Sequence, residues 1–214
     1  MPGVGYLLVA ELVGFSIFDA SFASIPNVLN IGIQSATLVL LALPMTLIIM
    51  SEGLDLSMGA VLGLAGIVLA TMLAHGSGLV VSLAGALVVG AGFGLANGML
   101  VAKIGIPPFI ATLGTLGIAQ GLAVAALLLT GRMNAGHPIA AIGMEFDAIA
   151  AVIVGGTSFE HGNGWLPGTL LGVLAIGALK NGLNVMAVPS SLQSAGIGLL
   201  VIAALLVDSR REPR

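Results

Sequence analysis

The side chains that could do chemistry in this chain are a few carboxylates and amides set among long apolar stretches. Asp55 lies between two such stretches, and amides occur inside them at Asn97, Gln120, Asn181 and Asn184. Where no water is available, these groups must find partners within the protein. They either hold helices together by hydrogen bonds or line a path along which amides replace water around a sugar's hydroxyls. Acidic groups in such surroundings are costly and tend to be functional, although Asp55 could equally cap a helix.

A second acidic pair, Glu145 and Asp147, has only one residue between its members. On a helix, side chains at this spacing do not face each other. One interpretation is that they are interfacial charges that cap and anchor a helix. The other is that they form a polar vestibule or gate at the membrane surface.

Residue patterns typical of enzymes and metal sites are missing. The stretch Gly172–Gly177 is followed by Ala178 rather than by the Lys of a phosphate-binding loop. His75, His137 and His161 fall in three different expected loops, without a second ligand at metal spacing. There are no cysteines, so thiolate metal sites are excluded. We therefore expect no catalytic residue, metal site or cofactor in this chain.

The composition predicts that membrane-spanning helices position these groups. Hydrophobic residues make up 58% of the 214 residues and charged residues 7%, whereas soluble domains carry roughly 25% charged residues. Residues 20–51, 56–102 and 104–131 contain no charge at all, and about 20 apolar residues suffice to cross a bilayer. We expect an all-α polytopic membrane helix bundle, a single transmembrane domain over residues 1–214.

About eight apolar segments are expected from the sequence. They cover residues 6–18, 35–50, 58–74, 79–102, 109–130, 146–154, 166–188 and 192–207. Positive residues favour the cytoplasmic side, which places the tail with Arg210, Arg211 and Arg214 and the loop with Lys103 inside, although Arg132 then lies outside. Eight crossings would put both termini in the cytoplasm.

Glycine is unusually frequent, at 32 residues, and small residues let membrane helices approach closely. Gly90, Gly94 and Gly98 recur every fourth residue, so they share a helix face that we expect to lie against another helix. The pairs Gly117/Gly121 and Gly168/Gly172 repeat this spacing.

Several ordered motifs resemble a known family. Ser51–Gly59 reads SEGLDLSMG, Asn97–Gly98 is followed by AKIGIPPFIATLGT at 102–115, and Phe146–Ser158 reads FDAIAAVIVGGTS. These residues resemble the ABC-transporter permeases for ribose-type sugars, in the superfamily of the branched-chain amino-acid permeases. The match runs from about residue 27 to residue 208, with Gly168–Gly172 and Asn181–Asn184 in the same order.

The resemblance implies a permease subunit that moves a monosaccharide across the bacterial inner membrane. It further implies a second permease chain, identical or different, a separate ATPase that uses ATP, and a periplasmic sugar-binding protein. Glu52 departs from the family, which usually has Gly there. Near Thr130–Arg132 an internal segment of about two spans is missing, together with the loop that docks on the ATPase. A degenerate permease, a stand-alone channel or carrier and a non-transporting membrane protein therefore remain alternatives.

Overall fold

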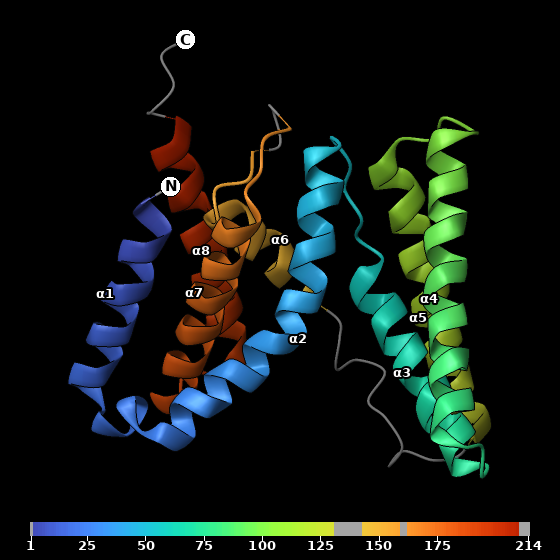
Figure 1. The fold of residues 1–214 in the computed structure, drawn as a ribbon, viewed down its shortest axis with the longest axis horizontal. Helices are drawn as coiled ribbons and strands as arrows, with labels where there is room; N and C mark the ends of the chain where they lie inside the picture. Colours follow the sequence, from blue (N-terminus) through green and yellow to red (C-terminus); the bar gives the residue numbers. More distant parts are fainter. Residues whose placement is uncertain (1, 131–142, 159–161, 210–214) are drawn as a thin grey trace. The chain divides into compact units, whose positions relative to one another are not determined.

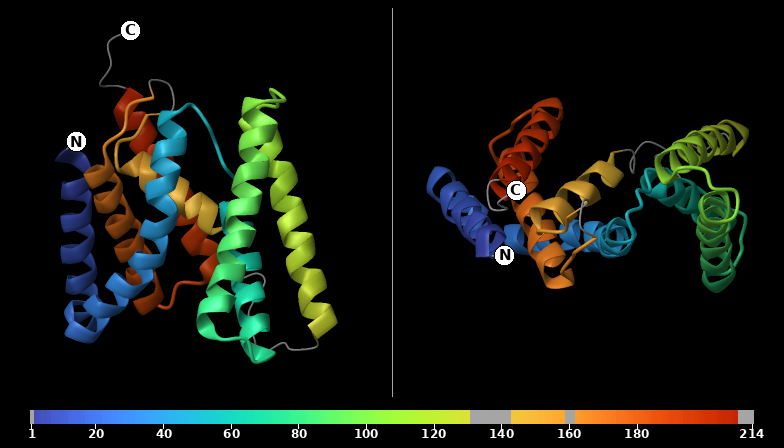
Figure 2. Two further views of the ribbon diagram at one scale, coloured as in Figure 1. Left: turned by 45° about the vertical axis from the view of Figure 1, so that its right-hand side comes forward. Right: turned by 90° about the horizontal axis from the view of Figure 1, so that it is seen from above.

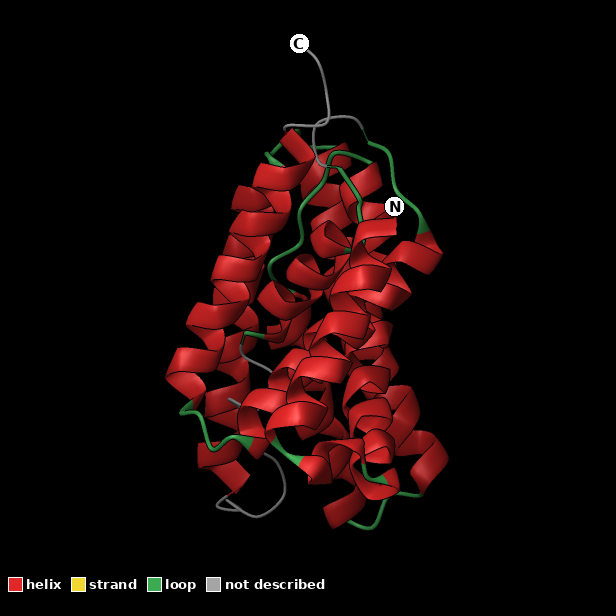
Figure 3. Cartoon of the chain, turned by 90° about the vertical axis from the view of Figure 1, so that its left-hand side faces the viewer, coloured by secondary structure: helices red, strands yellow, loops and turns green. Residues whose placement is uncertain are grey.

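The structure, a computed structural model, describes residues 2–130, 143–158 and 162–209. These residues form helices and loops without any strand (Figure 3). The α-helices of Figure 1 are α1 Pro2–Phe18, α2 Ile25–Met50, α3 Met58–Ala74, α4 Leu79–Ala102, α5 Pro108–Thr130, α6 Met144–Val154, α7 Leu166–Val185 and α8 Ser190–Ser209. A short 3-10 helix, η1 Ala20–Ala23, joins α1 to α2. The all-α prediction with about eight segments is confirmed for this part of the chain.

Four of the described helices are long and apolar enough to cross a membrane. They are α2, α4, α5 and α7, with mean hydropathies of 2.0, 2.2, 1.7 and 1.3. Three shorter apolar helices lie within α1, α3 and α8, and α6 has 11 residues. The helices therefore fit a multi-pass membrane protein.

The start of α2 is the one large difference from the expected boundaries. The helix begins at Ile25 rather than at residue 35. Ser24 is its N-cap, with the Oγ atom accepting a hydrogen bond from the Asn27 N–H at 3.4 Å, and a proline in the first turn suits a helix start. Asn27 and Gln34 interrupt the apolar pattern, so the apolar segment expected at 35–50 covers only the later turns of this helix, although the sequence Ser24–Asn27 predicts a turn and a helix start.

The chain divides into two compact units. Unit 1 contains residues 1–52 and 146–214, and unit 2 contains residues 53–145. In unit 1, α1 and α2 pack on α7 (Figure 1). The prediction of a single domain concerns the chain as a whole and stays a prediction.

Glycine brings two helices of unit 1 into close contact. A Cβ atom added to Gly172 of α7 would lie 2.0 Å from the carbonyl oxygen of Ala151 in α6. One added to Gly168 would lie 2.3 Å from the carbonyl oxygen of Gly155. Only glycine permits backbones to approach this closely, so this Gly-xxx-Gly pair does act as a packing face.

In unit 2, α4 and α5 pack on α3 and run beside each other (Figure 2). The core contains small and aliphatic side chains of α3 and α5, among them Leu64 and Ala119. Among the described residues of unit 2, nothing packs on the expected face at Gly90, Gly94 and Gly98, because a Cβ atom added to any of them would meet nothing within 4 Å. The rotation of α4 about its own axis places Gly85 and Phe93, rather than these three glycines, against the other helices of unit 2. Packing of this face against a second chain stays a prediction.

Candidate functional site

Unit 2 joins the motif residues into one hydrogen-bonded network, which is buried except for the half-buried Asp55. The Asp55 Oδ1 atom accepts hydrogen bonds from the Ser57 N–H at 2.8 Å and from the Ser57 Oγ at 2.6 Å. Asn97 of α4 donates through Nδ2 to the Ser57 Oγ at 3.0 Å. Thr115 of α5 donates to the Asn97 Oδ1 at 2.8 Å. The network thus connects the segment before α3 with α4 and α5.

The polar side chains of this network already form hydrogen bonds with one another or with the backbone. Ser57, Asn97 and Thr115 are buried, and Thr112 donates to the Leu54 carbonyl oxygen at 3.2 Å. A buried amide whose nitrogen and oxygen both bond neighbouring segments holds the helices together. Asn97 therefore matches the structural interpretation better than the pathway interpretation.

The structure corrects the capping role considered for Asp55. The N-cap of α3 is Ser57, and Asp55 instead closes a local turn through the Ser57 N–H. This turn is an Asx-turn, which fixes the chain just before the helix. Gln120 lies apart from the network, half-buried on α5, and makes no hydrogen bond within the described residues.

In unit 1 the two predicted amides of α7 differ in their surroundings. Asn181 is buried, and its Oδ1 atom accepts a hydrogen bond from Asn27 Nδ2 of α2 at 2.8 Å. Asn184 is exposed, and its Oδ1 atom accepts a hydrogen bond from Gln193 Nε2 of α8 at 2.9 Å. Both amides thus link α7 to another helix, but Asn181 is buried and Asn184 is exposed.

Glu145 and Asp147 have separate partners, as their spacing predicts. The Glu145 Oε2 atom accepts a hydrogen bond from the Gly143 N–H at 3.1 Å, which helps to fix the start of α6. Asp147 forms an ion pair with Lys180 of α7. Their role as a vestibule or gate stays a prediction.

Lys180 was missed as a site residue in the sequence. It is the only basic side chain within the described helices, and that isolation inside an apolar segment was the available signal. Its partner lies 33 residues away, so the pairing could not be read from local spacing.

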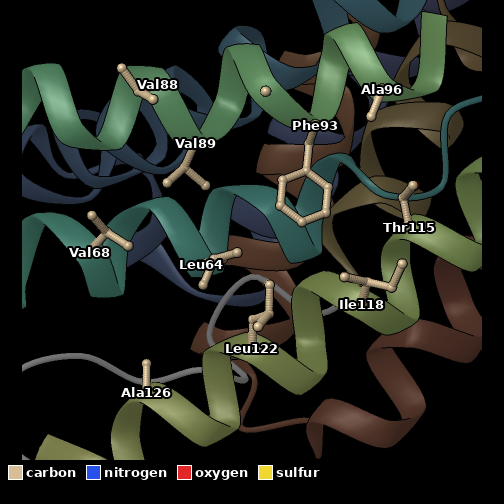
Figure 4. A pocket seen from close by; sticks show the side chains of 11 residues that line it. Leu64, Val68, Val88, Val89, Phe93, Ala96, Thr115, Ile118, Leu122 and Ala126 are labelled. Carbon is tan, nitrogen blue, oxygen red and sulfur yellow. The ribbon is translucent and has the colours of Figure 1, made fainter. Parts of the chain in front are cut away.

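An apolar groove lies between α3, α4 and α5 in unit 2 (Figure 4). It has a volume of about 590 Å³, and all its lining side chains except Thr115 are apolar. The Thr115 hydroxyl already donates to Asn97. The groove thus offers no polar group suited to a hydroxylated solute.

His75 lies at the exposed C-terminal end of α3, with Nδ1 2.8 Å from the Thr71 carbonyl oxygen. No group of three His, Cys, Asp or Glu residues in the described segments could hold a metal ion. His137 and His161 lie outside these segments, as does Arg132 at the expected junction.

Comparison with known proteins gives a consistent result. The family model described as "Branched-chain amino acid transport system / permease component" matches residues 27–136. The ribose import permease protein RbsC of Escherichia coli (strain K12) is 29% identical over 299 residues, which cover 96% of this chain and 93% of RbsC. RbsC of Bacillus subtilis (strain 168) is 28% identical, with coverages of 98% and 92%. The D-allose transport system permease protein AlsC of Escherichia coli (strain K12) is 28% identical over 275 residues, with coverages of 87% and 84%. No solved structure matches the chain.

The alignment lengths also bear on the missing segment. The alignment with Escherichia coli RbsC has 299 positions, whereas this chain has 214 residues. The difference of 85 is therefore the smallest number of RbsC positions without a counterpart here. That number is enough for at least two membrane spans and a loop.

Proposed function

We propose a transport function from the premise that this chain belongs to the family of permease components of branched-chain amino acid transport systems. It is a multi-pass membrane protein of this family. Within it, we assign the chain as the permease subunit of an ABC importer that moves a monosaccharide across the bacterial inner membrane. The observation that carries this assignment is the alignment, over 96% of the chain, with a ribose import permease.

The arrangement of polar groups supports the same assignment. In unit 2 the motif residues Asp55 and Asn97 belong to a largely buried network that joins the start of α3 to α4 and α5. In unit 1 Asn184 and Lys180 remain partly accessible. A rigid helical frame with a few accessible polar groups is what a membrane path for a hydroxylated solute requires.

The partners follow from the division of labour in such importers. This chain provides the membrane path and binds no cofactor of its own. A separate ATPase binds and hydrolyses ATP, a periplasmic protein delivers the sugar, and a second permease chain completes the path. We place both termini in the cytoplasm, as the positive residues favour.

The absence of at least 85 positions found in RbsC affects energy coupling. ATP hydrolysis can shift a transport equilibrium only through contacts that differ between the states of the permease. We infer that the missing positions follow Thr130 and include the ATPase-docking loop. The chain then requires a second, longer permease chain to contact the ATPase.

The test is reconstitution in liposomes with the ATPase and the sugar-binding protein, and ribose accumulation is measured with and without ATP. A version with the RbsC segment grafted after Thr130 is expected to accumulate ribose with ATP, and the 214-residue chain alone is not. ATP-driven accumulation by the unmodified chain would show that the docking element lies elsewhere. Failure of the grafted chain as well, with folding verified, would overturn the importer assignment.

A stand-alone channel or carrier is the second candidate, and the missing segment is the observation that favours it. Such a protein would equilibrate ribose across liposomes without ATP, ATPase or binding protein. Flux that is independent of ATP and saturates with ribose concentration would select this function over the importer.

A further inference from the structure

Four polar side chains form a band across three helices of unit 1. Asp147 of α6 pairs with Lys180 of α7, and Asn184 of α7 accepts a hydrogen bond from Gln193 of α8 at 2.9 Å. Lys180 and Asn184 are four residues apart on one helix, so they are neighbours on its surface. The two contacts therefore make one continuous polar surface, which we call the polar band.

The polar band keeps unused hydrogen-bonding capacity. The side chain of Lys180 is 36% exposed and that of Asp147 is 15% exposed, and an ammonium group has three donors, of which this ion pair uses one. Asn184 is exposed and donates to no other described residue. Gln193 is buried and holds Asn184 in place. The Asn97 network differs, because Ser57, Asn97 and Thr115 are all buried and joined to one another.

Placing an ion pair among apolar helices costs desolvation free energy, so such a pair indicates a functional role. Desolvation of two charges can exceed their mutual attraction, and ionisable groups inside membrane segments usually face a protein interior or a water-filled cavity. Since Lys180 is the only basic side chain within the described helices, the pair is a specific feature of this part of unit 1.

We propose that Asp147, Lys180 and Asn184, with Asn184 held by the buried Gln193, form a binding site for an uncharged, polyhydroxylated solute on its way through the permease. This inference rests on the proposed transport function and assigns its solute-contacting residues. Each sugar hydroxyl both donates and accepts hydrogen bonds, and the band offers carboxylate and amide oxygens beside ammonium and amide N–H groups. Its one positive and one negative charge cancel, so it compensates neither a sugar acid nor a sugar phosphate.

The chain contains no cysteine, so single cysteines can report on this surface. The test variant is Asn184→Cys, which leaves Gln193 its second acceptor, the Val188 carbonyl oxygen at 2.8 Å. The matched control is Leu192→Cys, since Leu192 is 60% exposed and adjoins Gln193 in α8. Modification by a water-soluble thiosulfonate is timed in membranes without ATP, with and without ribose or allose.

The thiol at position 184 should react, and its rate should fall roughly tenfold at a sugar concentration about ten times the Kd, because only unoccupied protein reacts. The rate at position 192 should not change with sugar. An unreactive Asn184→Cys thiol, or a rate that neither sugar lowers, would overturn the proposal. The assay needs no ATPase, so sugar protection can hold even if ATP-driven uptake fails, and uptake can hold while protection is absent.

Discussion

At the scale of single residues, the amides that look equivalent in the sequence have different environments. Asn97 and Asn181 are buried and joined to other helices, Asn184 is exposed beside Gln193, and Gln120 makes no hydrogen bond in the described segments. An amide in an apolar segment can therefore be a buried link between helices or an exposed group with hydrogen-bonding capacity left for another contact. The two classes should respond differently to substitution.

The Asn97→Ala substitution should lower the stability of the detergent-solubilised protein by about 1–3 kcal/mol, because it removes the two buried hydrogen bonds by which Asn97 joins Ser57 to Thr115. The matched control is Gln120→Ala, which removes an amide of the same unit that makes no hydrogen bond. Thermal unfolding of both variants gives the comparison. Equal shifts in Tm would contradict the structural role of Asn97.

The ion pair allows a double-substitution test. Lys180→Met or Asp147→Leu alone should each destabilise unit 1 by about 1–2 kcal/mol. This cost is smaller than for a fully buried ion pair, because solvent partly screens the exposed charges. The double variant should recover most of this loss, since no unpaired charge remains. Thermal unfolding of the four proteins measures the coupling, and the absence of any recovery would contradict it.

The double variant also separates structure from transport. If the polar band contacts solute, the double variant should remain stable yet lose sugar protection of a cysteine at position 184. Full protection in the stable double variant would limit the pair to a structural role.

At the scale of elements, equal glycine spacing has different consequences in different helices. Gly168 and Gly172 of α7 lie against the backbone of α6 and of Gly155 just after it, whereas none of the described residues would contact a Cβ atom added to Gly90, Gly94 or Gly98 of α4. Spacing identifies a smooth helix face, and the rotation of the helix in its unit decides what covers that face. The two faces therefore allow opposite predictions.

Gly172→Leu should disrupt unit 1, because even a Cβ atom would lie 2.0 Å from the Ala151 carbonyl oxygen. Gly94→Leu should leave the thermal stability of the isolated chain unchanged and weaken its association with a second permease chain. Thermal unfolding and crosslinking in membranes measure the two effects. Unchanged association of Gly94→Leu would show that this face contacts lipid.

At the scale of the whole molecule, the orientation proposed above gives opposite membrane sides to the two ends of α4. With the N-terminus inside, the turn at Ser77 lies outside and the loop after Lys103 lies inside. A membrane-impermeant maleimide added to spheroplasts should therefore label Ser77→Cys, and label Ile104→Cys only after the membrane is permeabilised. Ile104 is 67% exposed, which makes its loop a fair comparison. The reverse labelling pattern would invert the topology.

Much of the helical architecture was determined by the sequence alone. The expected bounds of α3 and α4 agree with the structure at both ends, because uninterrupted apolar runs between turns form helices from local information. The motifs at 51–59 and 102–115 indicated the family before any fold was known. The apolar segment expected at 35–50 covers only the later part of α2, because polar residues such as Asn27 interrupt its first turns, and only the contact with Asn181 explains why a polar residue lies there.

Only the tertiary structure decided which polar groups meet. Ser57 and Asn97 are 40 residues apart, and Asp147 and Lys180 are 33 apart. Helix periodicity fixes which residues share a face of one helix, but it contains no information on which helix lies opposite. The rotation and packing of each helix set the partners, and those partners separate a buried link such as Asn97 from an accessible group such as Asn184.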